Sequence, residues 1–299
     1  MDFSLQYQDY LDDINKEITA IACVPHSLQK SVFEAMNYAL TGGGKRIRPV
    51  LTVAVCDMLG GNHQDAVKVA AALECIHTYS LIHDDLPCMD DDDLRRGRPT
   101  CHKVFPENIA LLAGDGLLNL AFELLSDTSR YETLSDSVIV KLIAKVSKAS
   151  GTRGMIGGQV IDLESEGLSN VTEERLRELH RLKTGALILV SAQCGCICAG
   201  ILDETHDTFK HISEYASKLG LAFQVKDDIL DVIGEEEALG KPIGSDAKSE
   251  KNTFVTLLGL DGAKEELAQL TREAKEALDC FEHADFLVEL ADYLLKREY

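Results

Sequence analysis

Two groups of aspartates are the residues of this 299-residue chain most suited to chemistry. Residues 84–93 hold six aspartates, and a shorter group follows at Asp227, Asp228 and Asp231. Two like charges ~4 Å apart repel by about 4 kcal/mol at the effective dielectric constant near a protein surface, so dense carboxylates need cations among them. Carboxylate oxygens suit Mg²⁺, which also keeps waters and binds substrate phosphates. The two groups therefore predict a magnesium site, with a solvated acidic loop as the simpler alternative for either run alone.

Both groups follow apolar segments with helical periodicity. Residues 66–82 are almost wholly apolar, so Asp84 and Asp85 are expected to end a buried helix. Pro87 cannot lie inside that helix without clashing with the carbonyl of His83. Because Asp84 and Asp90 would be about 120° out of phase on a straight helix, an end or bulge here could orient both toward one ion. In the second segment, one helix face should carry Gly220, Gln224, Asp227 and Asp231.

Cations stand beside glycine loops in a chain whose net charge is −20. The stretch GGGKRIRP at 42–49 contains Lys45, Arg46 and Arg48, and Arg95 and Arg96 follow the first aspartate group. A helix end followed by a helix start accounts for the glycines and Pro49 but not for these cations. Backbone N–H groups of a glycine loop next to cations form an anion site.

Three residues lie beneath the first aspartate group on the same predicted helix. His77 is seven residues before Asp84 and shares its face, so it is either a core histidine or a residue facing a cavity. Ser80 is nearly on that face, and Tyr79 lies about 7.5 Å down the axis, turned to the flank. A small residue with a bulky one deeper describes a pocket with a floor, although Tyr79 could equally be an ordinary core aromatic.

Composition narrows the class of protein. The net charge of −20 argues against nucleic acid and against an anionic membrane surface as partners. The chain contains no charge-free run of 18 apolar residues, so we expect no membrane span, and the first residues do not resemble a signal peptide. Nine cysteines without an export signal suggest reduced thiols and a cytoplasmic location. Cys194, Cys196 and Cys198 are spaced so that they cannot converge on a metal from one helix.

The expected fold is all-α, as a single domain over residues 1–299. Strand patterns are nearly absent, and the six prolines leave residues 107–241 uninterrupted. Helices are predicted near 2–22, 28–40, 49–59, 64–85, 107–127, 134–149, 152–166, 172–182, 185–201, 206–233, 262–281 and 285–297. The pairs Gln159/Asp162 and Lys183/Thr184 fall on or between these helices, where capping and packing would explain them.

Carboxylates, a ring of cations and apolar walls together describe a site for a polyanionic head with an apolar tail. The fitting chemistry is metal-assisted departure of diphosphate from an allylic carbon, with fixed cations stabilising the leaving group. A carbocation formed in this way needs an apolar pocket without water. No serine or cysteine is paired with a base, so covalent catalysis is not expected.

These motifs resemble the trans-isoprenyl diphosphate synthase family over essentially the whole chain, and look most like bacterial farnesyl diphosphate synthases. The similar stretches are GGGKRIRP (42–49), HDDLPCMDDDDLRRGRPT (83–100), GGQVID (157–162), LKTGAL (182–187), FQVKDDILD (223–231) and GKPIGSD (240–246). One stretch departs from the family pattern: residues 250–255 read EKNTFV where relatives usually read GKxTYP. That departure puts in doubt any role assigned to this loop but leaves the aspartates untouched.

The resemblance implies an orthogonal helical bundle around a central cavity, a homodimer, and three Mg²⁺ per site, with Mn²⁺ able to substitute. The implied metal residues are Asp84, Asp90 and Asp227, with Asp85, Asp228 and Asp231 supporting and Asp231 counted as a further ligand. The implied isopentenyl diphosphate site comprises Gly44, Lys45, Arg48, His77 and Arg96. The implied allylic diphosphate site comprises Arg95, Lys183, Thr184, Gln224 and Lys241. Departing diphosphate is expected to remove the final proton.

The expected activity is condensation of isopentenyl diphosphate with dimethylallyl and geranyl diphosphates to farnesyl diphosphate. The resemblance supports this product because bacterial farnesyl synthases have an aromatic residue at the place of Tyr79 and two extra residues, here Pro87 and Cys88, in the motif. Alternatives are the same chemistry with a geranylgeranyl product and a terpene cyclase. Two others are a phosphohydrolase, which should carry more metal-binding histidines, and a non-catalytic partner subunit, which should have lost aspartates.

Overall fold

Helices make up nearly all of the regular structure in residues 2–168, 171–233 and 253–296, the part of the chain that this computed structural model describes. The first half contains α1 (Phe3–Ile21), α2 (Lys30–Leu40), α3 (Ile47–Met58), α4 (His63–Asp84), α5 (Cys101–Val104), α6 (Glu107–Ser126), the short helix η1 (Thr128–Arg130) and α7 (Asp136–Ser150). The second half contains α8 (Met155–Leu163), α9 (Glu173–His180), the π-helical segment η2 (Arg181–Gly185), α10 (Ala186–Cys198), α11 (Asp207–Ile233), α14 (Phe254–Glu276) and α15 (Asp285–Lys296). The prediction of an all-α fold is confirmed.

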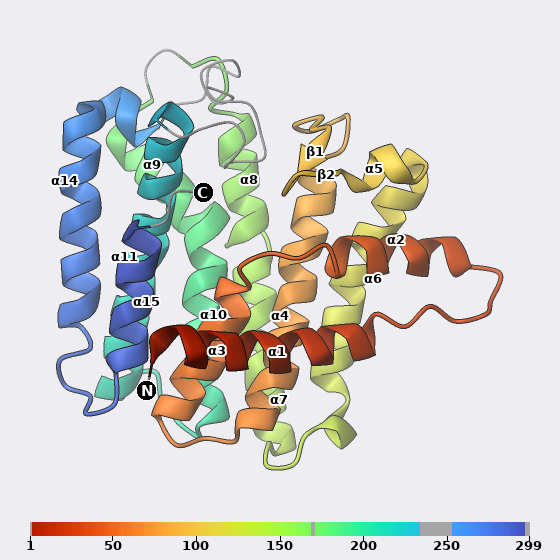
Figure 1. Cartoon of the computed structure of the whole chain (residues 1–299), viewed down its shortest axis with the longest axis horizontal. Helices are drawn as coiled ribbons and strands as arrows, with labels where there is room; N and C mark the ends of the chain where they lie inside the picture. Colours follow the sequence, from red (N-terminus) through yellow and green to blue (C-terminus); the bar gives the residue numbers. More distant parts are fainter. Residues whose placement is uncertain (1, 169–170, 234–252, 297–299) are drawn as a thin grey trace.

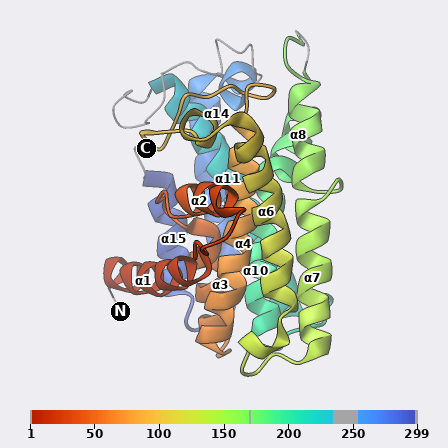
Figure 2. The same ribbon diagram turned by 90° about the vertical axis from the view of Figure 1, so that its right-hand side faces the viewer.

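The helices form layers around α4 and α10. Figure 1 shows α1 crossing in front of the upright helices α3, α4 and α10, and α2 crossing in front of α6. Figure 2 shows α1 and α2 on one side of the bundle and α7 and α8 on the opposite side, with α4 between them. This arrangement surrounds α4 with neighbours, so the helix that ends in the first aspartate group is buried along most of its length.

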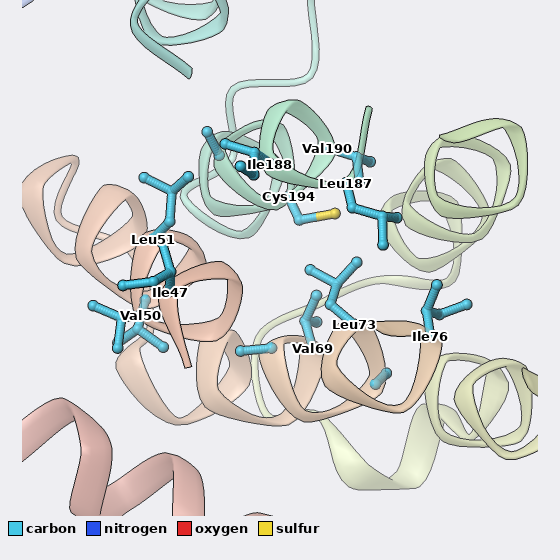
Figure 3. Packing of buried hydrophobic residues seen from close by; sticks show 14 of the residues in the cluster. Ile47, Val50, Leu51, Val69, Leu73, Ile76, Leu187, Ile188, Val190 and Cys194 are labelled. Carbon is cyan, nitrogen blue, oxygen red and sulfur yellow. The ribbon is translucent and has the colours of Figure 1, made fainter. Parts of the chain in front are cut away.

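The main core lies where α3, α4 and α10 meet. Figure 3 shows Leu51 of α3, Leu73 and Ile76 of α4, and Leu187 and Cys194 of α10 filling the space between these helices. Each fully buried side chain of this size contributes about 1.5–3 kcal/mol to folding, which fixes the direction of α4. Cys194, Cys196 and Cys198 are all buried free thiols in this core, as expected for small packing residues.

A second, smaller core holds α14 against α11. Its members include Val225 and Ile229 of α11 with Phe254 and Leu267 of α14. The first half of α11 contributes Phe209, Ile212 and Tyr215 to the main core, so one continuous helix links the two cores. The second aspartate group therefore lies on the stretch of α11 that α14 covers.

The structure differs from the predicted helices in three places. A two-stranded antiparallel hairpin pairs β1 (Leu94–Arg95) with β2 (Arg98–Pro99), because Arg96 and Gly97 both adopt positive φ and close a tight turn. The predicted junction at 182–185 is wrong, since η2 joins α9 to α10 without a break. The helix predicted near 262 begins at Phe254, where Thr253 and Thr256 form a capping box, and bends at Gly259.

One helix, α6, is long and apolar enough to cross a membrane by length and composition alone. The expectation of no such segment missed it, because a few charged residues interrupt its apolar run. Here α6 packs against α2, α4, α5 and α7. Core helices meet the same criterion, so this one segment is weak evidence for a membrane span. Leu111 and Leu112 on α6 are exposed.

Candidate active site

The first aspartate group begins where α4 ends, at Asp84, and Pro87 lies in the turn that follows. The amide N–H of Asp90 donates a hydrogen bond of 2.9 Å to the carbonyl oxygen of Asp84, which folds the turn back onto the helix end. Burial raises the pKa of Asp84, the charge of Lys183 opposes that rise, and the charge of Asp90 adds to it. The end of the helix predicted from Pro87 thus brings two carboxylates together.

An open cavity of about 350 Å³ lies beneath Asp84. It receives side chains from α3, α4, α8 and η2, four elements that are far apart in sequence. The predicted site residues that line it are Arg48, His77, Tyr79, Ser80, Asp84, Lys183 and Thr184. Both Tyr79 and Ser80 therefore face the same space as Asp84, whereas their effect on product length stays a prediction.

Lys183 links the π-helical segment to the first aspartate group. Its Nζ lies 2.6 Å from Oδ2 of Asp162 and 3.8 Å from Oδ2 of Asp84. The backbone of η2 approaches α8 so closely that a Cβ on Gly158 would lie 2.2 Å from the amide nitrogen of Lys183. Gly158, the second glycine of GGQVID, is therefore required for Lys183 to take this position.

Asp162 is a site residue that the sequence reasoning left as a packing residue. It carries the shorter of the two contacts to Lys183. Gln159, one turn earlier on α8, lines the cavity, and its Nε2 is buried without a hydrogen-bond partner. A polar pair at i and i+3 in an apolar helix was the available signal.

The second aspartate group is divided between buried and partly exposed residues. Asp227 is partly exposed, whereas Asp228 and Asp231 are buried. Oδ2 of Asp228 accepts a hydrogen bond of 2.7 Å from the amide of Phe254, so this carboxylate holds the start of α14. Phe254, at one of the positions that depart from the family pattern, thus has a structural role through its backbone amide. Thr184 donates to Oε1 of Gln224 at 2.9 Å, which connects η2 with α11.

Asp85 forms an ion pair with Arg95. Nε of Arg95 donates to Oδ1 of the buried Asp85 at 2.6 Å, and Nη2 lies 3.2 Å from Oδ2 of Asp92. Burial raises the pKa of Asp85 to about 6, although the bond to Arg95 lowers it. The arrangement fixes Arg95 against Asp85, and both residues line a small neighbouring hollow of about 60 Å³ together with Arg96. Within the described ranges, no three His, Cys, Asp or Glu side chains gather closely enough to form a metal site by themselves.

A group of cations lies next to these carboxylates. Nη1 of Arg48 lies 3.3 Å from Nε2 of His77, and Arg96 donates to the carbonyl of Gly43. Burial lowers the pKa of Arg48 to about 10, with the charge of Arg96 lowering it further. Burial and the charges of Arg48 and Arg96 hold the pKa of His77 well below its usual value, so His77 is neutral. Crowded, desolvated cations of this kind favour an anion between them.

The glycine loop lies against Arg96, one of these cations. Gly44 has a φ of +123°, and a Cβ there would lie 2.5 Å from the guanidinium of Arg96. Lys45 is partly buried beside it. Arg46, the third cation of the loop, turns the other way and pairs with Glu74 in the core. Lys241 and the motif 240–246 lie outside the described residues, as do 250–252.

The apolar walls of the cavity come from Met89, Met155, Ile156, Val160 and Leu163. Met89 and Val160 lie in the motifs quoted above, whereas the other three lie outside them. Tyr79 is buried, and its ring meets His83 edge-on with centroids 5.7 Å apart. His83 in turn donates to the carbonyl of Leu111 on α6 at 3.0 Å. Tyr79 is therefore held toward α6 through its contact with His83.

The sequence of this chain is similar to those of known proteins. The model of the polyprenyl synthetase family matches residues 29–290 of the chain. The chain is 44% identical to a geranylgeranyl pyrophosphate synthase large subunit of Arabidopsis thaliana, covering 95% of this chain and 76% of the relative. It is also 44% identical to a farnesyl diphosphate synthase of Bacillus subtilis, covering 92% and 90%.

A solved structure supports the same relationship. The chain is similar to a geranyltransferase of Helicobacter pylori determined with magnesium and isoprenyl diphosphate, with a TM-score of 0.83 and 38% identity over 97% of this chain and 96% of that one. Relatives that make products of two different lengths are thus equally similar to this chain.

Proposed function

The chain belongs to the polyprenyl synthetase family and is a prenyltransferase, and from this premise we propose that it makes farnesyl diphosphate. The substrates are isopentenyl diphosphate and the allylic dimethylallyl and geranyl diphosphates. The observation that best supports this is the cavity below Asp84, where the Asp84 carboxylate, the cations Arg48 and Lys183, and apolar walls occur together. Such a site fits a diphosphate with a hydrocarbon tail better than it fits either part alone.

We assign the carboxylates to magnesium. Asp84, Asp90 and Asp227 are the proposed direct ligands, with Asp231 as a further ligand and Asp85 and Asp228 in support. The donor set fits Mg²⁺, which takes few protein carboxylates and completes its shell with water and phosphate, so a cage of three side chains is not required. The similar Helicobacter pylori protein was solved with magnesium and isoprenyl diphosphate. Three ions per site, with Mn²⁺ as a substitute, remain part of this proposal.

We assign the cations to two diphosphates. The pair Arg48 and Arg96, with Gly44, Lys45 and neutral His77, surrounds the five-carbon homoallylic substrate. Thr184 contacts Gln224 and Arg95 contacts Asp85, and these residues, with Lys183 and Lys241, take the allylic diphosphate. Lys183 lies 2.6 Å from Asp162, so it is held in place before substrate arrives.

Different residues of the chain act at successive steps of the reaction. Lys183 and Arg95 stabilise the charge that develops on the allylic diphosphate as its carbon–oxygen bond breaks, and bound Mg²⁺ supplies further positive charge there. Met155, Ile156 and Val160 exclude water from the allylic cation. The cation alkylates the double bond of isopentenyl diphosphate. The departed diphosphate, held by Lys183 and Arg95, then accepts the proton that restores a double bond.

The product assay tests the proposal directly. Purified protein is incubated with labelled isopentenyl diphosphate, dimethylallyl or geranyl diphosphate, and Mg²⁺, and the chain length of the product is determined. We expect a fifteen-carbon diphosphate. A twenty-carbon product would favour the alternative of a geranylgeranyl synthase, and cyclised hydrocarbon would favour a terpene cyclase.

Tyr79 is the proposed floor of the product cavity. Removing its ring in Tyr79→Ala opens space below Asp84, so we expect products of twenty carbons or more with condensation intact. Tyr79→Phe is the matched control, because it keeps the ring and removes only a hydroxyl that has no hydrogen-bond partner. We expect the control to keep the fifteen-carbon product. If Tyr79→Ala still released only fifteen carbons, the floor would lie elsewhere.

A homodimer through α6 is proposed to complete the enzyme. Leu111 and Leu112 are 45% and 51% exposed on a helix that is otherwise strongly apolar, and Val140 of the neighbouring helix α7 is exposed as well. Covering these side chains with a second copy would remove apolar surface from water. We expect a dimer in sedimentation velocity, and Leu112→Glu should shift it toward monomer. A wild-type monomer at micromolar concentration would contradict this assignment.

We propose a cytoplasmic location. The nine cysteines are free thiols, which suits a reducing compartment. The Arabidopsis thaliana relative is named as chloroplastic, so fractionation of the source cells is the deciding measurement.

A further inference from the structure

A second cavity, which we call the distal cavity, has a volume of about 710 Å³ and shares no lining residue with the cavity below Asp84. It lies among α7, α9, η2, α10, α11 and α14, and Figure 1 shows α9, α10, α11 and α14 in the left half of the molecule. No step of the reaction described above uses it.

The distal cavity is lined by more cations than anions. Six Lys and Arg side chains face it, against the carboxylates of Glu266 and Glu273. Arg177 lies 2.8 Å from Glu266 and Lys218 lies 2.5 Å from Glu273, so both carboxylates are already neutralised. In a chain of net charge −20, this local excess of positive charge is the opposite of the average surface.

Two of the six cations have no ion-pair partner within the described part of the chain. They are Lys148, in the last turn of α7, and Arg153, just before α8. Arg181 joins them on the cavity wall, where Glu178 pairs with it at 2.7 Å. An anion placed between Lys148 and Arg153 would gain two charge-assisted contacts without breaking an existing ion pair.

The remaining wall is apolar. Leu182 and Leu189 come from η2 and α10, Leu221 from α11, and Leu270 from α14. Leu182 and Leu270 are buried, so their exposed edges belong to the cavity alone. A hydrocarbon chain over these side chains would remove further apolar surface from water at roughly 25 cal/mol per Å².

The distal cavity and the active site share one turn of backbone. Arg181, Leu182 and Gly185 of η2 line the distal cavity, whereas Lys183 and Thr184 of the same segment line the active site. A π-helical turn is less stable than α-helix and is frequent at functional sites. Gly158 packs closely against the backbone of Lys183. A shift of η2 therefore moves Lys183 relative to Asp84.

We propose that the distal cavity binds a phosphate ester of a medium-length hydrocarbon chain, and that its occupation changes turnover through the π-helical segment. The phosphate lies between Lys148 and Arg153, and the chain lies over Leu189, Leu221 and Leu270. This inference goes beyond the proposed function, because the ligand binds a site that the condensation does not use.

Binding is tested with n-octyl phosphate by calorimetry of the full chain. The buffer contains a chelator, so that Mg²⁺ does not recruit the phosphate to the active-site carboxylates, and saturating isopentenyl diphosphate, which occupies the cations near Arg48. We expect the double variant Lys148→Glu/Arg153→Glu to bind at least tenfold more weakly than wild type. Lys16→Glu/Lys264→Glu is the matched control: it makes the same change of charge at two exposed lysines outside the cavity and should bind as wild type does. Equal weakening in both double variants would show that only net charge matters and would overturn the site.

Inorganic phosphate tests the apolar part of the site. We expect it to bind wild type at least tenfold more weakly than octyl phosphate does. Equal affinities would show an anion site without a hydrocarbon channel, which contradicts the proposed ligand class.

Coupling is tested by turnover at saturating substrates and Mg²⁺. Octyl phosphate should change the turnover of wild type and of the control at least twofold, and leave the Lys148→Glu/Arg153→Glu variant unaffected. No change in wild type, or the same change in the cavity variant, would overturn the coupling. Failure of the proposed function would appear separately, as absence of prenyl transfer in wild type without octyl phosphate.

Discussion

Replacing Asp84 or Asp227 with asparagine is expected to lower turnover with Mg²⁺ by at least ~100-fold, equivalent to about 3 kcal/mol of lost transition-state stabilisation. The amide keeps the size of the carboxylate and removes its charge. Asp84 ends α4 at the cavity, and Asp227 acts electrostatically on Arg48 from α11. Loss of turnover in both variants would indicate that one metal cluster depends on residues from two separate helices.

The matched control lies in the same acidic run. Asp93 is exposed and its Oδ1 lies 2.7 Å from Nζ of Lys103, away from the cavity. Asp93→Asn removes the same charge from the same loop, so we expect turnover within about twofold of wild type, since exposed ion pairs contribute little. Circular dichroism checks that all variants are folded. Near-normal turnover of Asp84→Asn and Asp227→Asn would contradict the metal assignment.

The parts of the site that sequence could predict are those with local causes. Pro87 cannot continue α4, because its ring would clash with the carbonyl of His83, so the end of the helix before Asp90 was predictable. The apolar run 66–82 leaves no solvent-facing side, which makes the burial of α4 predictable. His77 shows where prediction from sequence stops. Its helix face was predictable, but whether it faced the cavity or the core depended on the position of Arg48 on α3.

The parts that sequence could not predict depend on contacts across the chain. The π-helical segment arises where α9 and α10 meet, and the propensities of Lys183 and Thr184 do not mark it. Asp162 became a site residue only because Gly158 lets η2 approach α8. Arg46 was grouped with Lys45 and Arg48 by sequence, yet it adopts a φ of 49° and points into the core. The predicted role of Tyr79 in product length belongs to the same class, since the position of its ring depends on His83, which contacts α6.

Glu74→Gln is expected to lower the free energy of unfolding by about 3–5 kcal/mol. Oε1 of Glu74 lies 2.5 Å from Nη1 of Arg46, and both side chains are only 2% exposed. Arg46 also donates to the carbonyl of Leu40 at 2.8 Å and to Oδ1 of Asn15 at 3.3 Å. Removing the carboxylate leaves a guanidinium buried without its counter-charge, and desolvation of that charge is the main cost. Urea denaturation of wild type and variant measures the difference.

Two comparisons separate the buried charge from other causes. Glu34→Gln breaks an exposed pair with Lys30 at 2.8 Å, and it should cost less than about 0.5 kcal/mol because water screens both groups. Arg46→Met/Glu74→Met removes both charges and keeps most of the volume, so it should recover much of the stability lost in Glu74→Gln. If the double variant were as unstable as Glu74→Gln, packing around Glu74 rather than the uncompensated arginine would be the cause. Recovery would show that the core around this ion pair tolerates apolar residues in place of both charges.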